Sequence, residues 1–237
     1  ASRCYQLWAE AADGVIHHTL AGMEVARATY RFGPDTAHVV IPHGHWGQRY
    51  RHLGGTSRAQ VEAEEGWPPC ALRLAVIGAP RAEKDLQLVV DAVARSTRPD
   101  VQLIVRVDDA VDLPADARII PERGHVEEHR YHRRLAAYDA LVLPFAPAGM
   151  LTTGTAFDGI GAGVPVITSD WSFFDETFRG ADIRYGSTAG DLTATIDSLS
   201  NDDLERARQA TLALRPDYDW ATIADRTYAF LDDIARD

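Results

Sequence analysis

The chain has 237 residues and a formal net charge of −11, from 24 Lys and Arg against 35 Asp and Glu. Hydrophobic residues make up 46% and charged residues 25%, which excludes a disordered chain and suffices for a sizeable core. The acidic balance argues against nucleic-acid binding, because a protein neutralises phosphates with clustered Lys and Arg. No apolar run of the sequence approaches the roughly 20 residues of a membrane span. Two cysteines are too few for a disulfide scaffold, and we expect a reducing, cytoplasmic location.

The first residue is Ala1, with neither an initiator Met nor a signal-peptide pattern, which predicts a processed or truncated start. Residues 4–12 favour a helix. Short strands are predicted at 15–16 and 38–41, on either side of a helix over 22–30. The remaining apolar patterns predict strands at 72–77, 101–105, 117–120, 140–143 and 164–167, and helices near 86–93, 126–137, 155–162 and 220–234.

Apolar strands that alternate with helices indicate an α/β fold, with a Rossmann-like parallel sheet covered by helices on both faces. The stretch 44–69 has the weakest pattern and is interpreted as a linker that contains a short helix over 58–65. In parallel sheets of this kind, ligands bind beyond the carboxyl ends of the strands. We therefore expect a ligand at the loops that follow Ile77, Val105, Leu143 and Ile167.

The most informative of these loops leads into the helix predicted at 155–162. It contains Thr152, Thr153, Gly154 and Thr155, whose backbone amides and hydroxyls favour phosphate binding at a helix start. Asp158 follows about one turn into the helix, where its carboxylate could accept hydrogen bonds from a ribose diol. The alternative is an ordinary Thr N-cap, followed by glycines that pack closely against the sheet.

A second loop, from Gly78 to Asp85, also joins a strand to a helix. Arg81 and Lys84 stand where cations can reach a diphosphate held over the edge of the sheet. Lys84 is the only lysine in the sequence. The alternative is a solvated pair of cations, although a helix start is an unfavourable place for Lys84. The position of Lys84 therefore favours a function.

The nine histidines give two further patterns. Residues 125–129 match the zinc-protease motif H-x-x-E-H, and His132 follows on about the same helical face. Arginines crowd this helix, so we interpret it as a solvated face rather than a metal site. His43 and His45 lie in the predicted hinge, where His45 either touches a ligand in the cleft or belongs to a plain loop.

The two loops described above, together with further motifs along the chain, resemble in their order the donor half of a GT-B glycosyltransferase of the large retaining family 4. Residues 12–19 (ADGVIHHT) are similar to the last strand of that family's acceptor domain. Lys84 follows Gly78 by six residues, as in the family's G-R-x-x-x-x-K-G pattern. Four further segments resemble V-I-P-N/H-G, A-D-V-x-V-x-P, x-E-A-x-A-x-G-x-P-V and S-W-E-x-I-A, at residues 38–44, 138–144, 157–166 and 219–224 respectively.

The resemblance implies transfer of a sugar, with retention, from a nucleotide diphosphate sugar to a saccharide, lipid or natural product. It implies no metal or other cofactor, and a UDP-sugar rather than a GDP-sugar as donor. Arg81 and Lys84 would be the catalytic cations, which stabilise the leaving diphosphate. The implied donor-binding residues are Gly78, Thr152, Thr153, Gly154, Thr155, Asp158 and Glu176.

Several positions depart from the family pattern. Ala79 stands where the family has Arg, and Asp85 where it has Gly. The helix carboxylate is the shorter Asp158 instead of Glu, and Met150 stands at the first acidic position of E-x7-E. Residues 153–155 look like the Ser/Thr-Gly-Thr loop that some branches carry instead.

The resemblance also implies a division of the chain, in which only the last elements of an acceptor domain are present. The missing half would be truncated or would come from a second chain, and peripheral membrane contact would run through it. Two rival functions stay open, a GT-B nucleotide-sugar epimerase and a non-catalytic nucleotide-sugar-binding subunit. The expected parts are an acceptor-domain remnant at 1–43, a linker at 44–69, a donor-binding domain at 70–217 and a crossover helix at 218–237.

Overall fold

The structure, a computed structural model, describes residues 3–108, 111–145 and 152–236. The strands in these ranges are β1 (Gly14–His17), β2 (Ala37–Val40), β3 (Leu72–Val76), β4 (Val101–Arg106), β5 (Ile119–Glu122), β6 (Ala140–Leu143), β7 (Val166–Thr168) and β8 (Ile183–Arg184). The α-helices are α1 (Arg3–Ala11), α2 (Leu20–Thr29), α3 (Arg58–Glu65), α4 (Leu86–Arg95), α5 (Glu128–Arg134), α6 (Gly154–Ala162), α7 (Ser172–Phe178), α8 (Ala189–Ser198), α9 (Asn201–Leu214) and α10 (Trp220–Ile234). The 3₁₀ helices are η1 (Gly47–Gly55), η2 (Leu135–Ala137) and η3 (Arg215–Tyr218).

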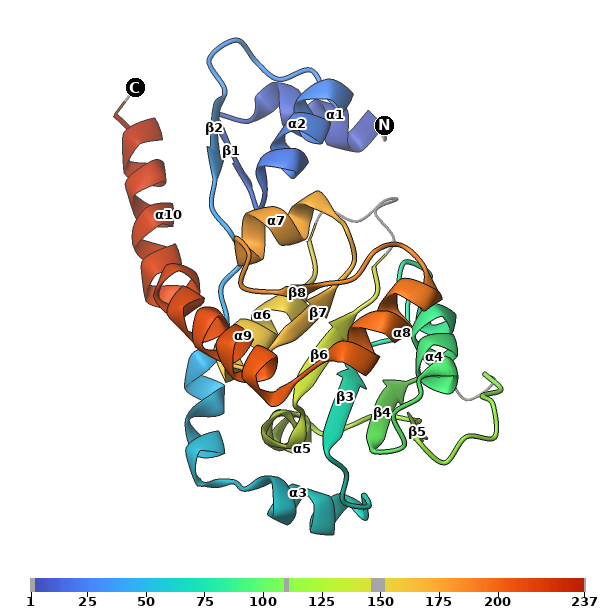
Figure 1. The fold of residues 1–237 in the computed structure, drawn as a ribbon. Helices are drawn as coiled ribbons and strands as arrows, with labels where there is room; N and C mark the ends of the chain where they lie inside the picture. The colour runs from blue at the N-terminus through green and yellow to red at the C-terminus, as the bar shows by residue number, and fades with distance from the viewer. Residues whose placement is uncertain (1–2, 109–110, 146–151, 237) are drawn as a thin grey trace.

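The large sheet is parallel throughout, in the order β5-β4-β3-β6-β7-β8 (Figure 1). The chain runs outward from β3 to β5, then returns to the other side of β3 and continues to β8. This is the Rossmann strand order, and its direction reverses between β3 and β6, where Leu74 pairs with Ala140. The predicted α/β class and parallel sheet are confirmed. The reversal also fixes the place where such sheets bind ligands.

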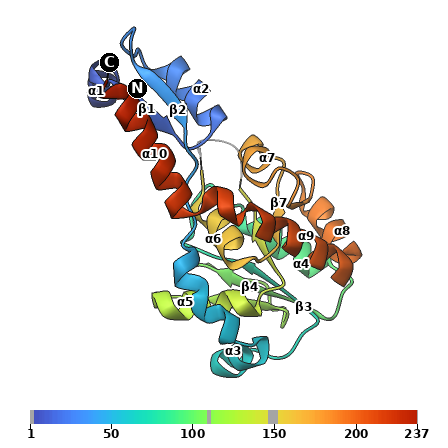
Figure 2. The same cartoon turned by 90° about the vertical axis from the view of Figure 1, so that its left-hand side faces the viewer.

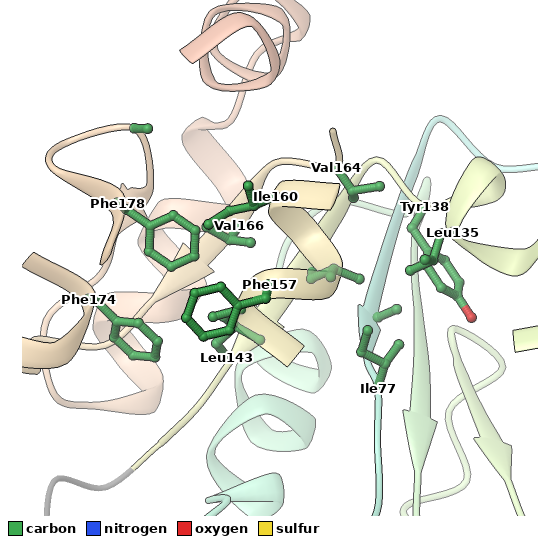
Figure 3. Close-up of a cluster of buried hydrophobic side chains, with 14 of the residues drawn as sticks. Ile77, Leu135, Tyr138, Leu143, Phe157, Ile160, Val164, Val166, Phe174 and Phe178 are labelled. Atoms are coloured by element: carbon green, nitrogen blue, oxygen red, sulfur yellow. The ribbon is translucent and has the colours of Figure 1, made fainter. Parts of the chain in front are cut away.

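Alternate residues of β3 enter two separate cores, because successive side chains of a strand point to opposite faces. Leu74 and Val76 join a core that α4 and α8 cover. Ala75 lies in the other core, which includes Phe157 of α6 and Phe174 of α7 (Figure 3). Each fully buried phenylalanine contributes about 1.5–3 kcal/mol. The helices that carry the predicted site are thus held on the sheet by apolar packing.

A small unit, formed by α1, β1, α2 and β2, lies apart from the large sheet (Figures 1 and 2). Its two strands are parallel and pair Gly14 with Ala37. Helix α10 runs from the large sheet to this unit, where Arg226 Nη2 donates to the Val40 carbonyl at 2.8 Å. A Cβ at Gly14 would lie 2.2 Å from Ile234 Cδ1, so the glycine permits close packing of α10. The last helix therefore ties the small unit to the large sheet.

Several predicted boundaries are confirmed. Helix α3 spans 58–65 as predicted, because Ser57 and Gln60 form a capping box and Gly66 ends the helix at φ +68°. The prediction for β6 is also correct. The helix predicted at 126–137 is shorter, since α5 ends at Arg134 and continues as η2. The structure contains further elements that the sequence patterns do not predict: η1, α7, β8, α8, α9 and η3.

The prediction of a solvated face on α5 is only partly correct. His125 and His129 are exposed, whereas His132 is 6% exposed and packs edge-on against the Tyr50 ring. Arg134 is also buried and pairs with Glu65 of α3. The arginines of this helix therefore bind α3 instead of facing solvent alone.

Among the described residues, none of the helices combines the length and apolar character that a membrane span requires.

Candidate functional site at the switch point of the sheet

Gly78 lets the loop after β3 approach the start of α6. Its φ is +77°, a conformation that residues with a side chain rarely adopt. A Cβ at this position would lie 2.9 Å from Thr155 Cγ2 and 3.2 Å from Lys84 Nζ. The structure therefore brings Gly78, Lys84 and Thr155 together at the point where the strand order reverses.

Lys84 is buried inside this loop, with 8% of its surface exposed. Its Nζ donates to the carbonyls of Ile77 at 2.7 Å and Ala79 at 2.9 Å. These bonds use two of the three ammonium hydrogens. Burial, and next the charge of Arg81, lower the pKa of Lys84 to about 8. The solvated-pair alternative is wrong for Lys84 but describes Arg81, whose side chain is exposed.

The start of α6 keeps its first-turn amides free of a side-chain cap. Thr153 occupies the N-cap position, yet its side chain makes no capping bond. Its Oγ1 instead lies 2.9 Å from the Oγ1 of Thr155, and both threonines are buried. Gly154 is exposed between them. The Thr N-cap of the alternative interpretation is therefore wrong, whereas its close packing of a glycine against the sheet is confirmed, because a Cβ at Gly159 would lie 2.8 Å from Val166 Cγ1. A helix start without a side-chain cap leaves backbone amides that can bind an anion.

Before Thr153, the structure describes only Thr152 of the predicted phosphate-binding loop. The Oγ1 of Thr152 is buried and has no hydrogen-bond partner among the described residues. Met150, the residue at the broken E-x7-E position, lies outside the described ranges.

Asp158 is held by two tyrosines, neither of which belongs to a sequence motif. Its Oδ1 accepts a hydrogen bond from the Tyr50 hydroxyl at 2.6 Å, and its Oδ2 accepts one from Tyr131 at 2.7 Å. Burial lowers the pKa values of Lys84 and His43, and the negative charge of Asp158 offsets part of that lowering at both groups. Asp158 therefore belongs to the same electrostatic environment as Lys84.

Glu176 makes a different set of contacts from the other predicted donor residues. Its Oε2 accepts from the Leu20 amide at 2.6 Å and its Oε1 from the Ala21 amide at 3.1 Å. A carboxylate is stabilised there, since these are the first amides of α2. Glu176 thus joins α7 to the small unit, and its predicted contact with a donor stays a prediction.

The two hinge histidines have different surroundings. His45 is 4% exposed, its Nε2 donates to the Arg215 carbonyl at 3.1 Å, and its Nδ1 accepts from the Gly47 amide. Both ring nitrogens are engaged within the chain, which favours the loop alternative for His45 over contact with a ligand. His43 lies nearer to the site, with its ring 5.0 Å from that of Phe157. Within the described part of the chain, no three His, Cys, Asp or Glu side chains are grouped to hold a metal ion.

A helix start without an N-cap side-chain bond, a buried lysine and a tight glycine turn meet at the switch point of a Rossmann-order sheet. These features are typical of the ligand-binding edge of a doubly wound α/β domain. The chain belongs to the Glycosyl transferase-like family, whose profile matches residues 86–229. No curated protein sequence matches the chain.

Solved structures extend the likeness to nearly the whole chain. A glycosyltransferase from Rickettsia africae ESF-5 has a TM-score of 0.81 at 12% identity, over 100% of this chain and 68% of that one. Anabaena Alr3699/HepE, in complex with UDP-glucose, has a TM-score of 0.77 at 17% identity, over 98% and 67%. Sucrose-phosphate synthase from Thermosynechococcus elongatus has a TM-score of 0.74 at 18% identity, over 98% and 61%. The GT-B resemblance is confirmed, and the chain spans roughly two thirds of the length of these structures.

Proposed function

We propose that this chain is the donor-binding part of a retaining glycosyltransferase that uses a nucleoside diphosphate sugar. One observation carries the proposal: Gly78, Lys84 and the uncapped start of α6 meet at the switch point, in a chain of the Glycosyl transferase-like family. The fold of HepE, whose structure contains UDP-glucose, supports uridine as the base.

The proposed chemistry is electrostatic. When the bond between the sugar and the diphosphate breaks, negative charge develops on the phosphate oxygens. Lys84, the exposed Arg81 and the first amides of α6 at Gly154 and Thr155 would stabilise that charge. The hydroxyls of Thr152 and Thr153 would add donors, and Asp158 would accept hydrogen bonds from the ribose. The acceptor would be a saccharide, a lipid or a natural product.

The division of the chain is part of this proposal. We assign 1–43 to the end of an acceptor domain, 44–69 to a linker, 70–217 to donor binding and 218–237 to a crossover helix. The contacts of α10 with the small unit support the last assignment. The rest of the acceptor domain would come from a longer protein or from a second chain.

A second candidate is a non-catalytic nucleotide-sugar-binding subunit. The chain spans 61–68% of the length of the three compared structures. Such a subunit would bind the donor and leave the transfer to a partner.

Titration calorimetry with UDP, UMP and GDP tests the site that both candidates share. We expect UDP to bind at least about 10-fold more tightly than UMP, because the second phosphate meets Lys84 and the start of α6. Equal affinities for UDP and UMP, or no binding of either UDP or GDP, would contradict the proposal.

A further inference from the structure

We propose that Tyr50 and Tyr131 are positioning residues, which fix the carboxylate of Asp158 for the ribose diol of the donor. This inference rests on the proposed function and adds to it a basis for selecting ribose. Tyr50 lies in η1 and Tyr131 in α5, so two separate elements hold one carboxylate of α6.

The two hydroxyls hold different oxygens of Asp158, at 2.6 Å for Oδ1 and 2.7 Å for Oδ2. Burial, and next the charge of Asp158, raise the pKa of both tyrosines well above its ordinary value. Both phenols therefore stay protonated and donate to the carboxylate over the whole neutral range. An anchored carboxylate cannot rotate, so the plane of its two oxygens is fixed.

Each carboxylate oxygen can accept two hydrogen bonds. One of these is used by a tyrosine, and the other can accept from a ribose hydroxyl. The 2′ and 3′ hydroxyls of ribose lie side by side, so a carboxylate of fixed orientation can bind both at once. Asp158 is half-buried rather than fully enclosed.

The rings of both tyrosines are held independently of their hydroxyls. The buried His132 ring lies 5.1 Å from that of Tyr50 and 5.5 Å from that of Tyr131, both nearly edge-on. Tyr50→Phe and Tyr131→Phe therefore remove one hydrogen bond each and keep the ring packing. Tyr218→Phe is the matched control, because the buried Tyr218 hydroxyl donates to the Thr177 carbonyl at 2.7 Å rather than to Asp158.

The test compares three ligands by calorimetry on the full chain: UDP, 2′,3′-dideoxy-UDP and inorganic pyrophosphate. We expect Tyr50→Phe and Tyr131→Phe each to lower the affinity for UDP about 10-fold, which is the effect of losing one charge-assisted hydrogen bond. Binding of dideoxy-UDP and pyrophosphate should not change, and Tyr218→Phe should change none of the three. A purely structural role of the tyrosines would weaken all three ligands together, and that result would overturn the inference.

A second measurement keeps the inference testable if a tyrosine variant folds poorly. In Asp158→Asn, the preference for UDP over dideoxy-UDP should fall, and adding Tyr131→Phe should cause no further loss of it. Additive losses would contradict the inference. If the wild-type chain binds UDP but has no preference over dideoxy-UDP, the inference alone is wrong. If it binds neither nucleotide, the proposed function is wrong as well.

Discussion

Arg73, which is fully buried as the second residue of β3, pairs with Glu62 of α3 at 2.5 Å. The guanidinium also donates to the Pro68 carbonyl and to Gln102. A buried charge of this kind is tolerated only while its partners are present. The pair therefore ties α3 to β3 within the large sheet.

Replacing Glu62 should destabilise the fold strongly. We expect Glu62→Gln to lower the free energy of unfolding by about 3–5 kcal/mol, because it leaves the buried Arg73 uncompensated. Urea unfolding measures the change. Glu64→Gln is the matched control, since Glu64 and its partner Arg133 are both exposed by more than a third and such pairs contribute about 0–1 kcal/mol. Equal losses in the two variants would show that the burial of Arg73 does not matter.

Glu65 should add an acid-sensitive contribution to stability. Burial alone would raise the pKa of Glu65, but hydrogen bonds from Arg130 and Arg134 lower it from an ordinary value of 4.5 to about 2. A depressed pKa in the folded state means that the contribution is present above pH 4.5 and is lost as the pH falls towards 2. Stability measured against pH should therefore fall less steeply in this window for Glu65→Gln than for wild type. Identical slopes would contradict the assignment.

Because of Lys84, nucleotide binding should become weaker at alkaline pH. The pKa of Lys84 is about 8, so its ammonium loses its charge as the pH rises through this value, and UDP should then bind more weakly. The free energy of unfolding should instead increase as the pH rises from 8 to 10.5, because the folded state binds the proton of Lys84 less tightly than the unfolded state. Calorimetry between pH 6.5 and 9.5 and unfolding over the same range give both curves.

Lys84→Met is the variant that isolates this charge. Lys84→Met should weaken UDP binding by about 1.5–3 kcal/mol, and the decline of UDP affinity at alkaline pH should disappear. It should also cost some stability, because Nζ closes the loop through the carbonyls of Ile77 and Ala79. An alkaline decline that persists in this variant would assign the titration to another group.

The fold and the core of the site could be predicted because their signals are local. Apolar strands between helices indicate a parallel sheet, and the carboxyl-edge rule then places the loops of Gly78 and Thr155 close together. The residues that begin and end helix α3, Ser57 and Gly66, are directly adjacent to it in the sequence. By contrast, β8 has only two residues, too few to show an alternating pattern.

The contacts that complete the site could not be predicted, because they join distant parts of the chain. Tyr50 is 108 residues from Asp158, and Tyr131 is 27 residues from it. The arginines of the helix that carries Tyr131 predict a solvated face, because their partners on α3 are remote in the sequence. Glu176 and Leu20 are 156 residues apart, so no local pattern reveals that this carboxylate caps α2.

The last prediction concerns transfer by residues 1–237 alone. The chain spans roughly two thirds of the length of the GT-B structures it matches, and the proposed acceptor side is limited to the small unit. Holding two reactants in alignment can lower a barrier by about 7 kcal/mol or more. Without a complete acceptor surface, we expect this chain to bind UDP-glucose but to transfer glucose negligibly. Release of UDP in the presence of a panel of saccharide and lipid acceptors measures the transfer, and calorimetry on the same preparation verifies binding. Turnover at about 1 per second or more would show that these residues suffice, and the proposed missing acceptor half would be wrong.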